Sequence, residues 1–289
     1  MSSPAAAASP ASASHPLAVR TVAHKFGGTS VADADRYRHV AQLLLARDEP
    51  VQVTVVSAMK GVTDALIELA RAAAATRADE ITPEWRERWH ELRARHRGVA
   101  VSLLGELAGP AVEWLDQRFD ELAQVLAALS VIGGLPEEVL QRVQGLGEVY
   151  SARLLGEHLR ALGADCAVLD AREVLVVSHG DLGVDVDWEL SGRKLAAWRA
   201  ANPQPRVVVT GFVARDPQGR ITTLGRNGSD YSGAIFARLF EADELHIWTD
   251  VDGVLSADPR VVPEAVQLDS LSYDEACELA YFGAKVVHP

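Results

Sequence analysis

Residues 21–56 read TVAHKFGGTSVADADRYRHVAQLLLARDEPVQVTVV, and this stretch decides the fold. A β-prone run at 21–26 stops at a Gly-Gly pair, and the apolar positions of 33–47 recur with helical spacing. The next run, 51–56, is almost continuously apolar, which is typical of a strand covered on both faces. A strand, a glycine turn, a helix and a second strand are the opening of a parallel α/β sheet.

The chain after this opening changes character twice. Residues of about 62–163 show helical periodicity and no convincing strand, so we predict a helical insertion rather than an independent domain. The α/β pattern then resumes, with strands predicted at 166–169, 174–177, 207–210 and 245–249 and helices at about 188–201 and 230–240. Residues 21–289 are therefore predicted to form one α/β domain.

Composition and charge restrict the class of function. The 289 residues carry a formal net charge of −12, which argues against binding nucleic acid or an anionic membrane surface. A small phosphate-bearing ligand remains compatible, since it needs only a few local donors. No apolar run is long enough to span a membrane, so we expect no membrane segment.

The N-terminal segment and the two cysteines also bear on where the protein acts. Residues 1–20 are mostly Ala, Ser and Pro without a secretory signal, and we predict a disordered tail on a cytoplasmic protein. Cys166 and Cys277 are expected to be buried thiols rather than a disulfide or a metal site.

Two polar loops follow predicted strands near the start of the chain. In the first, Lys25 precedes Gly27 and Gly28, whose backbone N–H groups can approach a phosphate closely. In the second, Ser57 and Thr63 stand between a strand and a helix. Loops beyond the carboxyl ends of parallel strands share one crevice, so we expect these two to meet. The alternatives are a purely structural glycine turn and a simple helix cap.

Two further polar clusters occupy equivalent places later in the chain. Arg226 and Ser229 precede a predicted helix that begins at about Asp230, and an arginine there can hold a carboxylate or phosphate bidentately. The alternative for Asp230 is an ordinary residue of the helix N-terminus. Thr249 and Asp250 follow the last predicted strand in an acidic turn that suits a nucleotide or metal site, although Asp-Gly is also common turn chemistry.

Together these residues resemble the catalytic domain of aspartokinases, in the amino acid kinase family. The resemblance runs from residue 24 onward and rests on KFGGTSV at 25–31, VVSAMKGVTDAL at 55–66, GLGEVYSARLL at 145–155, TTLGRNGSDYSGA at 222–234, WTDVDGV at 248–254, ADPR at 257–260 and YFGAKVVHP at 281–289.

The resemblance implies a three-layer αβα sandwich around a mostly parallel eight-stranded sheet. It also implies transfer of the γ-phosphoryl group of ATP, with Mg²⁺, to the side-chain carboxylate of L-aspartate, the first step toward lysine, threonine and methionine. Lys25 would stabilise the transferring group, with Asp230 holding Lys25 in place. The expected aspartate-binding residues are Ser57, Thr63, Glu148, Phe212, Arg226 and Ser229. The expected nucleotide-binding residues are Gly27, Gly28, Thr249, Asp250, Asp258, Arg260 and Lys285.

Three departures from the family pattern refine these expectations. Arg226-Asn227-Gly228 is more similar to aspartokinases fused to a second enzyme, and Leu255 replaces a usual tyrosine near the nucleotide base. The paired regulatory ACT domains of the family are not found in residues 1–289. We therefore expect a piece of a longer enzyme, a fusion with diaminopimelate decarboxylase or homoserine dehydrogenase, able to form a homo-oligomer.

Two other functions are weighed against this one. A kinase of the same fold acting on acetylglutamate or a nucleotide would share the glycine loops, but would not be expected to combine Glu148 in GEVYS with GRNGSD. A domain that binds ATP and aspartate without efficient turnover would keep all of the binding residues. Ligand binding without turnover would distinguish it.

Overall fold

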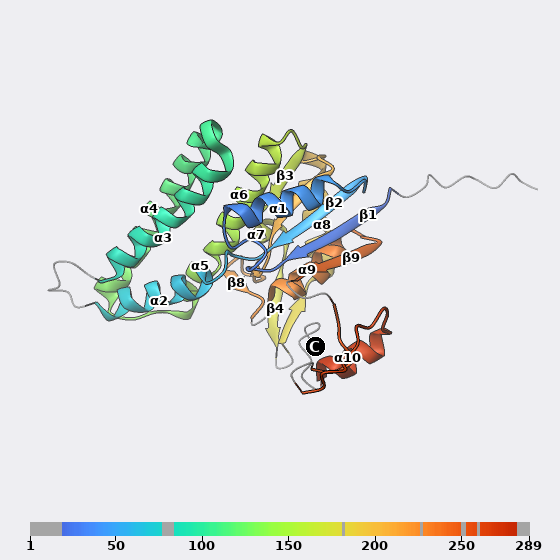
Figure 1. Cartoon of the computed structure of the whole chain (residues 1–289). Coiled ribbons are helices and arrows are strands. Elements are labelled where there is room, and N and C mark those ends of the chain that lie inside the picture. The colour runs from blue at the N-terminus through green and yellow to red at the C-terminus, as the bar shows by residue number, and fades with distance from the viewer. Residues whose placement is uncertain are drawn as a thin grey trace, which may run out of the picture.

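Parallel strands form the central sheet, in the order β3-β6-β2-β1-β9 (Figure 1). The computed structural model describes residues 19–76, 84–180, 183–225, 228–249, 253–258 and 261–281. The five strands are β1 (Thr21–Phe26), β2 (Val51–Val56), β3 (Cys166–Leu169), β6 (Arg206–Thr210) and β9 (Glu244–Trp248). All four pairings are parallel, so every strand ends at the same edge of the sheet.

Helices cover both faces of this sheet, which gives the three layers that the sequence predicts. Strand side chains alternate between the faces. Phe26, Val56 and Val208 pack with α1 (Ala34–Leu45) and α6 (Leu146–Ala161). Ala23 and Val55 face the opposite layer, formed by α8 (Trp188–Ala201) and α9 (Gly228–Leu239). The α/β class and the mostly parallel sheet are confirmed.

The number of strands in the main sheet differs from the expected eight. Within the described residues it holds five, and the remaining strands form two separate antiparallel pairs. These pairs are β4 (Val177–Gly180) with β5 (Gly183–Val186), and β7 (Val213–Arg215) with β8 (Ile221–Thr223). The two strands of each pair are close in the chain. Pairing with each other therefore costs less loop-closure entropy than joining the main sheet.

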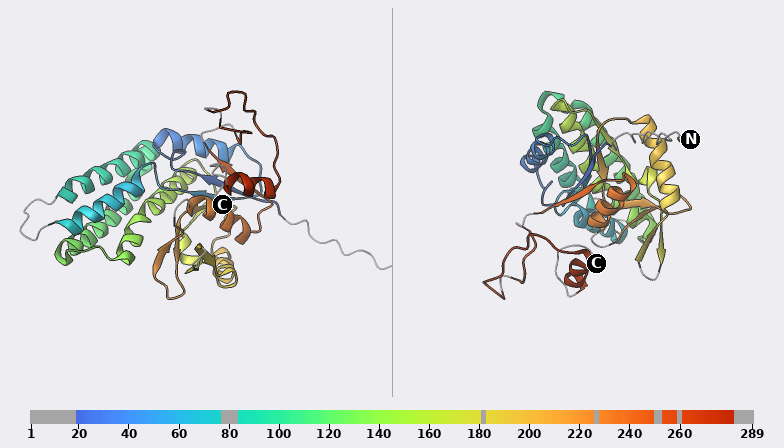
Figure 2. Two further views of the ribbon diagram at one scale, coloured as in Figure 1. Left: turned by 90° about the horizontal axis from the view of Figure 1, so that it is seen from below. Right: turned by 90° about the vertical axis from the view of Figure 1, so that its right-hand side faces the viewer.

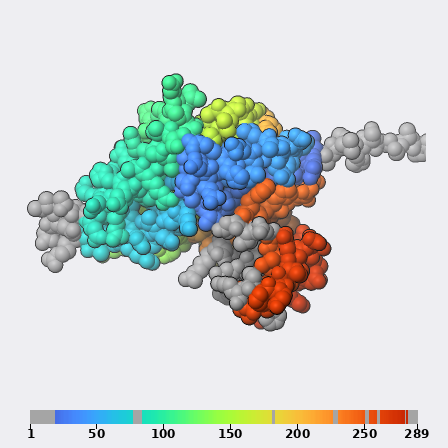
Figure 3. All heavy atoms as spheres, in the orientation of Figure 1, coloured from blue at the N-terminus to red at the C-terminus, as the bar shows by residue number. Residues whose placement is uncertain are grey.

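The stretch predicted to be helical contains helices joined by turns, and no strand, among its described residues. They are α2 (Val62–Ala75), α3 (Glu84–Leu104), a 3₁₀ turn (Gly105–Ala108), α4 (Gly109–Ile132), α5 (Glu137–Gln144) and α6. Figure 2 shows α2, α3 and α4 as a bundle on one side of the sheet, and Figure 3 shows them occupying that side of the surface.

One helical stretch is apolar enough to attract notice as a membrane segment. Glu84–Ile132 contains an 18-residue window of mean hydropathy 1.2, of which 39% is buried. The stretch comprises two helices, α3 and α4, that pack against each other and against α2 (Figure 1). Many of its apolar residues, such as Trp89, Leu115 and Phe119, belong to the core. Length and composition alone are weak evidence for a span.

Two expectations from the sequence are wrong in detail. The run 174–177 is not one strand, because α7 (Ala171–Val174) ends there before β4 begins. Asp170 caps this short helix by accepting from the Arg172 N–H at 3.0 Å. Cys166 is buried as expected, whereas Cys277 is exposed on α10 (Tyr273–Tyr281), in which no described side chain is buried.

Close packing of α6 on the sheet depends on the absence of a side chain at Gly156. A Cβ there would lie 2.1 Å from Cγ2 of Val168 on β3. We predict that Gly156→Ala lowers the free energy of unfolding by about 1–3 kcal/mol through overpacking. Gly192→Ala on α8 is the matched control, since a Cβ there meets nothing within 4 Å. The control should gain about 0.5–1 kcal/mol from helix propensity. Urea denaturation measures both, and equal gains in the two variants would contradict the packing.

Candidate active site

Three loops meet at the edge where the parallel strands end. Backbone hydrogen bonds join them in sequence: Ser57 N–H donates to Phe26 C=O at 3.1 Å, and Lys60 N–H donates to Gly28 C=O at 3.0 Å. On the other side of β2, Gly211 N–H donates to Val56 C=O at 2.9 Å. The loops after β1, β2 and β6 are thereby fixed relative to one another. This edge is where open α/β sheets bind ligands.

Lys25 forms an ion pair with Asp230 across two elements. Lys25 is the next-to-last residue of β1, and its ammonium lies against the carboxylate of Asp230 in the first turn of α9. The Lys25 side chain is 9% exposed and that of Asp230 is 33% exposed. The aliphatic part of Lys25 passes Gly233, where a Cβ would come within 3.1 Å of it. A nearly buried cation held by one carboxylate is well placed to meet a phosphate from the solvent side.

The glycine turn after β1 leaves backbone open toward this cation. A Cβ on Gly28 would lie 2.8 Å from the Ala58 carbonyl oxygen, so no side chain fits there. A Cβ on Gly27 would lie 3.4 Å from Lys25 Nζ. The Ser30 N–H closes the turn on the Gly27 carbonyl at 3.0 Å. Such a turn lets a phosphate approach main-chain N–H groups and Lys25 together.

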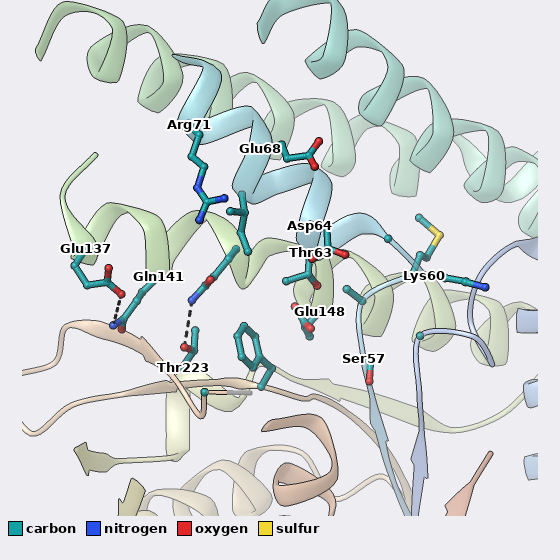
Figure 4. Close-up of a pocket in the computed structure, with 18 of the residues that line it drawn as sticks. Ser57, Lys60, Thr63, Asp64, Glu68, Arg71, Glu137, Gln141, Glu148 and Thr223 are labelled. Carbon is teal, nitrogen blue, oxygen red and sulfur yellow. Dashed lines mark hydrogen bonds between the residues drawn. The ribbon is translucent and has the colours of Figure 1, made fainter. Parts of the chain in front are cut away.

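A pocket of about 930 Å³ opens beside this turn (Figure 4). Its walls come from the glycine turn, the β2–α2 loop, α2, α5, the start of α6 and the β7–β8 region. Lining residues with polar side chains include Ser57, Lys60, Thr63, Asp64, Gln144, Glu148, His179 and Thr223. The N-terminus of α2 faces the pocket after Gly61, which takes a left-handed conformation at φ 78°. A helix N-terminus favours a negatively charged ligand group.

Glu148 is a buried carboxylate at the floor of the pocket. It is 4% exposed, and burial raises its pKa to about 7 although it accepts from the Ala58 N–H. Its Oε2 atom has no hydrogen-bond partner in the part of the chain that the structure describes, and the same is true of Ser57 Oγ. Buried polar atoms normally have partners. Two partnerless ones in one pocket indicate a place for a ligand's donors.

Tight packing brings Glu148 to this position. The preceding Gly147 lies against the β2–α2 loop, where a Cβ would come 2.7 Å from Ala58 Cβ and 2.9 Å from Val62 Cγ1. Any larger residue would push the start of α6 away from the loop. The glycine therefore permits the Ala58 N–H to reach the Glu148 carboxylate.

Phe212 holds an uncommon backbone conformation on the opposite wall. Its φ is 66°, a left-handed value that costs energy in a residue other than glycine. Its N–H donates to Ser232 Oγ at 2.7 Å, and its carbonyl accepts from Leu224 N–H at 2.8 Å. These bonds hold the strained residue at the pocket, where its ring forms part of the lining.

The structure describes ten of the fifteen residues that the sequence nominates for the site. Lys25 and Asp230 are paired, and Gly27 lies beside them. Gly28, Ser57, Thr63, Glu148 and Phe212 line the large pocket, and Thr249 lines a neighbouring one. Asp258 is exposed and lines neither pocket. Outside the described residues lie Arg226, Asp250, Arg260 and Lys285, together with the side chain of Ser229.

Several pocket residues were not found from the sequence. His179 lines the pocket, and its Nε2 lies 2.7 Å from Thr222 Oγ1. Gln144 donates to Thr223 Oγ1 at 3.3 Å across the same wall. His179 lies on β4, and the partner of Gln144 lies on β8. The sequence patterns of these short strands are too weak to predict either position. The role of Gly147, by contrast, could have been predicted from the sequence. Glycines stand on both sides of Leu146, directly before Glu148, and such a pattern suggests close backbone approach.

Comparison with known proteins identifies the family. The family model described as "Amino acid kinase family" matches residues 20–289. The chain belongs to the amino acid kinase family. Within it, the chain is 41% identical over 268 residues to bifunctional aspartokinase/homoserine dehydrogenase 1, chloroplastic, of Arabidopsis thaliana, covering 92% of this chain and 29% of that protein. It is 36% identical over 280 residues to lysine-sensitive aspartokinase 3 of Escherichia coli, covering 93% of this chain and 57% of that protein.

Solved structures of this family agree in fold. Escherichia coli aspartokinase III in complex with aspartate and ADP superposes with a TM-score of 0.80 at 30% identity, covering 93% of this chain and 58% of that one. The same enzyme in complex with lysine and aspartate superposes with a TM-score of 0.79. The chain is thus homologous to aspartate kinases, and it spans less than a third of the bifunctional relative's length.

The raised pKa of Glu148 predicts a pH-dependent cost to folding. In the folded chain the pKa of the Glu148 carboxyl is about 7, whereas its ordinary pKa is 4.5. Stability is therefore lost as pH rises from about 4.5 to 7. Glu148→Gln keeps an acceptor for Ala58 N–H without a charge, so its melting temperature should exceed the wild type's above pH 7.

The advantage of Glu148→Gln should disappear near pH 4.5, where both side chains are neutral. Glu138→Gln is the matched control, because Glu138 is exposed on α5. Thermal unfolding at several pH values measures the difference. A Glu148→Gln advantage that does not depend on pH would contradict the buried, ionisable carboxylate.

Proposed function

We propose that this chain is an aspartokinase catalytic unit. It transfers the γ-phosphoryl group of ATP to the side-chain carboxylate of L-aspartate and yields 4-phospho-L-aspartate, the first step toward lysine, threonine and methionine. The single observation that carries the proposal is the buried Glu148 carboxylate, with a partnerless oxygen, in a pocket that reaches the Gly28 turn beside Lys25. An amino acid needs an anion for its ammonium group, and phosphoryl transfer needs a cation at the other end.

Lys25 and the glycine turn act on the phosphoryl group. Charge on the transferred group is spread over its peripheral oxygens, so catalysis depends on positioned donors rather than on covalent chemistry. Lys25 supplies a fixed positive charge, and the Gly27 and Gly28 amides supply dipoles beside it. Asp230 orients the Lys25 ammonium through their ion pair. Burial of Lys25 strengthens its field at the reacting group.

The large pocket binds the acceptor. Glu148 accepts from the ammonium group of aspartate, and Arg226 binds its α-carboxylate bidentately. Ser57, Thr63 and the N-terminus of α2 stabilise the side-chain carboxylate, together with Ser229. The Phe212 ring closes one wall, which keeps the reacting groups from water. The aspartate named in the bound complexes of the Escherichia coli enzyme supports this choice of acceptor.

The nucleotide binds beyond the glycine turn. Thr249 and Asp250 begin its site at the end of β9, and Asp258, Arg260 and Lys285 complete it. Mg²⁺ enters with the phosphates of ATP as part of the substrate. Magnesium bound to phosphates needs only one or two carboxylates from the protein. ADP bound to the Escherichia coli enzyme supports a nucleotide site in this fold.

The wider setting of the enzyme is part of the same proposal. The chain acts in the cytoplasm, as a homo-oligomer within a longer enzyme that carries ACT domains. Relatives in which aspartokinase is joined to homoserine dehydrogenase support that enzyme as the second activity, rather than diaminopimelate decarboxylase. Neither nucleic acid nor a membrane is a partner, in keeping with the charge of −12.

An aspartyl-hydroxamate assay with MgATP tests the reaction. The purified chain should convert L-aspartate, and Lys25→Ala should lower kcat by about 100-fold or more, since one charge-stabilising donor is lost. Lys194→Ala, which removes an exposed lysine on α8, is the control and should retain wild-type activity. Equal activity of Lys25→Ala and wild type would refute the proposed role, and activity on acetylglutamate instead of aspartate would refute the substrate.

The pKa of Glu148 predicts how substrate affinity changes with pH. Only the ionised carboxylate pairs with the aspartate ammonium group, and burial places its pKa at about 7. The KM for L-aspartate should therefore rise as pH falls below 7, by about tenfold per pH unit once the carboxyl is mostly protonated. In Glu148→Gln the KM should be high at every pH, with no such slope. A wild-type KM that is constant between pH 5.5 and 8 would contradict the pairing.

A further inference from the structure

We propose that Trp248 and His24 are positioning residues that hold the start of the nucleotide-binding loop, and this proposal rests on the function proposed above. Neither residue belongs to the Lys25 side of the sheet. Lys25 faces α9, whereas His24 and Phe26, its neighbours along β1, face α1. The two residues therefore act on the site through the strand ends rather than by touching the reacting groups.

Register places Trp248 where it can link two loops of the site. β1 and β9 are parallel, and Phe26 pairs with Trp248 as the last residue of each strand. The next residue after Phe26 is Gly27, and the next after Trp248 is Thr249. The position of the Trp248 ring therefore influences both the phosphate-binding turn and the first nucleotide-binding residue.

An aromatic ring and a cation both contact the Trp248 ring. It stacks on Phe26 with ring centroids 5.6 Å apart and an interplanar angle of 5°. The Arg47 guanidinium lies 5.6 Å from the ring centroid, and an ion pair with Glu49 at 2.6 Å fixes this arginine. Stacking and cation–π contacts hold the plane of the ring and leave rotation within that plane open.

One hydrogen bond fixes that rotation. Trp248 Nε1–H donates to Nδ1 of His24 at 3.2 Å. The imidazole is fully buried and its pKa is lowered to about 4, chiefly by burial, so it is neutral near pH 7 with its proton on Nε2. Nε2 has no hydrogen-bond partner among the described residues. An apolar residue would avoid that buried, unpaired N–H. A histidine at this place is therefore best explained by the bond that it accepts from Trp248.

Space beside the ring makes this bond matter. A second pocket, of about 410 Å³, is lined by Trp248, Thr249 and the Thr29–Ser30 part of the glycine turn. The ring is thus not confined by packing on that side and could turn into the pocket. The bond to His24 keeps it against Phe26. Loss of the bond should loosen Thr249 and weaken nucleotide binding. The aspartate pocket should be spared, because neither Trp248 nor Thr249 lines it.

Calorimetric binding of MgADP and of L-aspartate to the whole chain tests the inference. Trp248→Phe keeps an aromatic stack but has no N–H, and His24→Leu removes the acceptor. Each should weaken MgADP binding by roughly three- to tenfold, the effect of one neutral hydrogen bond. Aspartate binding should change by less than about twofold. The double variant should be no weaker than either single variant, because both remove the same bond.

Trp198→Phe on α8 is the matched control and should bind both ligands as the wild type does. Unchanged MgADP affinity in Trp248→Phe would overturn the inference. So would a parallel fall in both affinities with a lower melting temperature, which is the result of a purely structural role. A wild-type chain that binds neither ligand would instead refute the proposed function, and the positioning role with it.

Discussion

The parallel pairing of β1 with β2 and β9 is the constraint on which the rest of the structure depends. It brings the ends of three strands to one edge, where main-chain bonds from Ser57 to Phe26 and from Lys60 to Gly28 hold the following loops. Successive side chains of β1 point to opposite faces of the sheet, so neighbouring residues take part in different contacts. Lys25 points toward α9 and its partner Asp230, while Phe26 points toward α1 and stacks on Trp248. A shift of one residue in this register would exchange the two faces and abolish both arrangements.

Close backbone packing gives the site its electrostatic character. Gly28 and Gly147 allow the glycine turn and the start of α6 to approach the β2–α2 loop from two sides. That approach buries Glu148 and leaves one of its oxygens without a partner in the described part of the chain. The folded chain thus stores an unfavourable carboxylate that a bound ammonium group would neutralise. Functional sites often retain such locally destabilising groups, and the left-handed backbone of Phe212 is a second case in the same pocket.

Much of this architecture is predictable from the sequence because its signals are local. The largely apolar run 51–56 and the Gly-Gly pair after 21–26 were enough to predict the opening strand–helix–strand unit. The β4–β5 and β7–β8 pairs were not predicted, since their strands have three or four residues and little alternation. At 174–177 the apolar pattern favoured a strand, but α7, which Asp170 caps at its N-terminus, extends into this run and ends at Val174. The resemblance to aspartokinases nominated Glu148 for the site. The partnerless oxygen of Glu148, the stack of Phe26 on Trp248 and the bond from Trp248 to His24 depend on distant segments and required the structure.

The central claim is that this edge of the sheet delivers a phosphoryl group to the side-chain carboxylate of L-aspartate. Borohydride reduction of the reaction mixture tests it most directly, because reduction converts an acyl phosphate into the alcohol at the carbon that carried it. Mass spectrometry after incubation of the chain with MgATP and L-aspartate should detect homoserine, which derives from the side-chain acyl phosphate. A Lys25→Ala reaction should yield far less of it in the same time. Detection of 3-amino-4-hydroxybutanoate, the product of phosphorylation at the α-carboxylate, or of no reduced amino acid at all, would contradict the account.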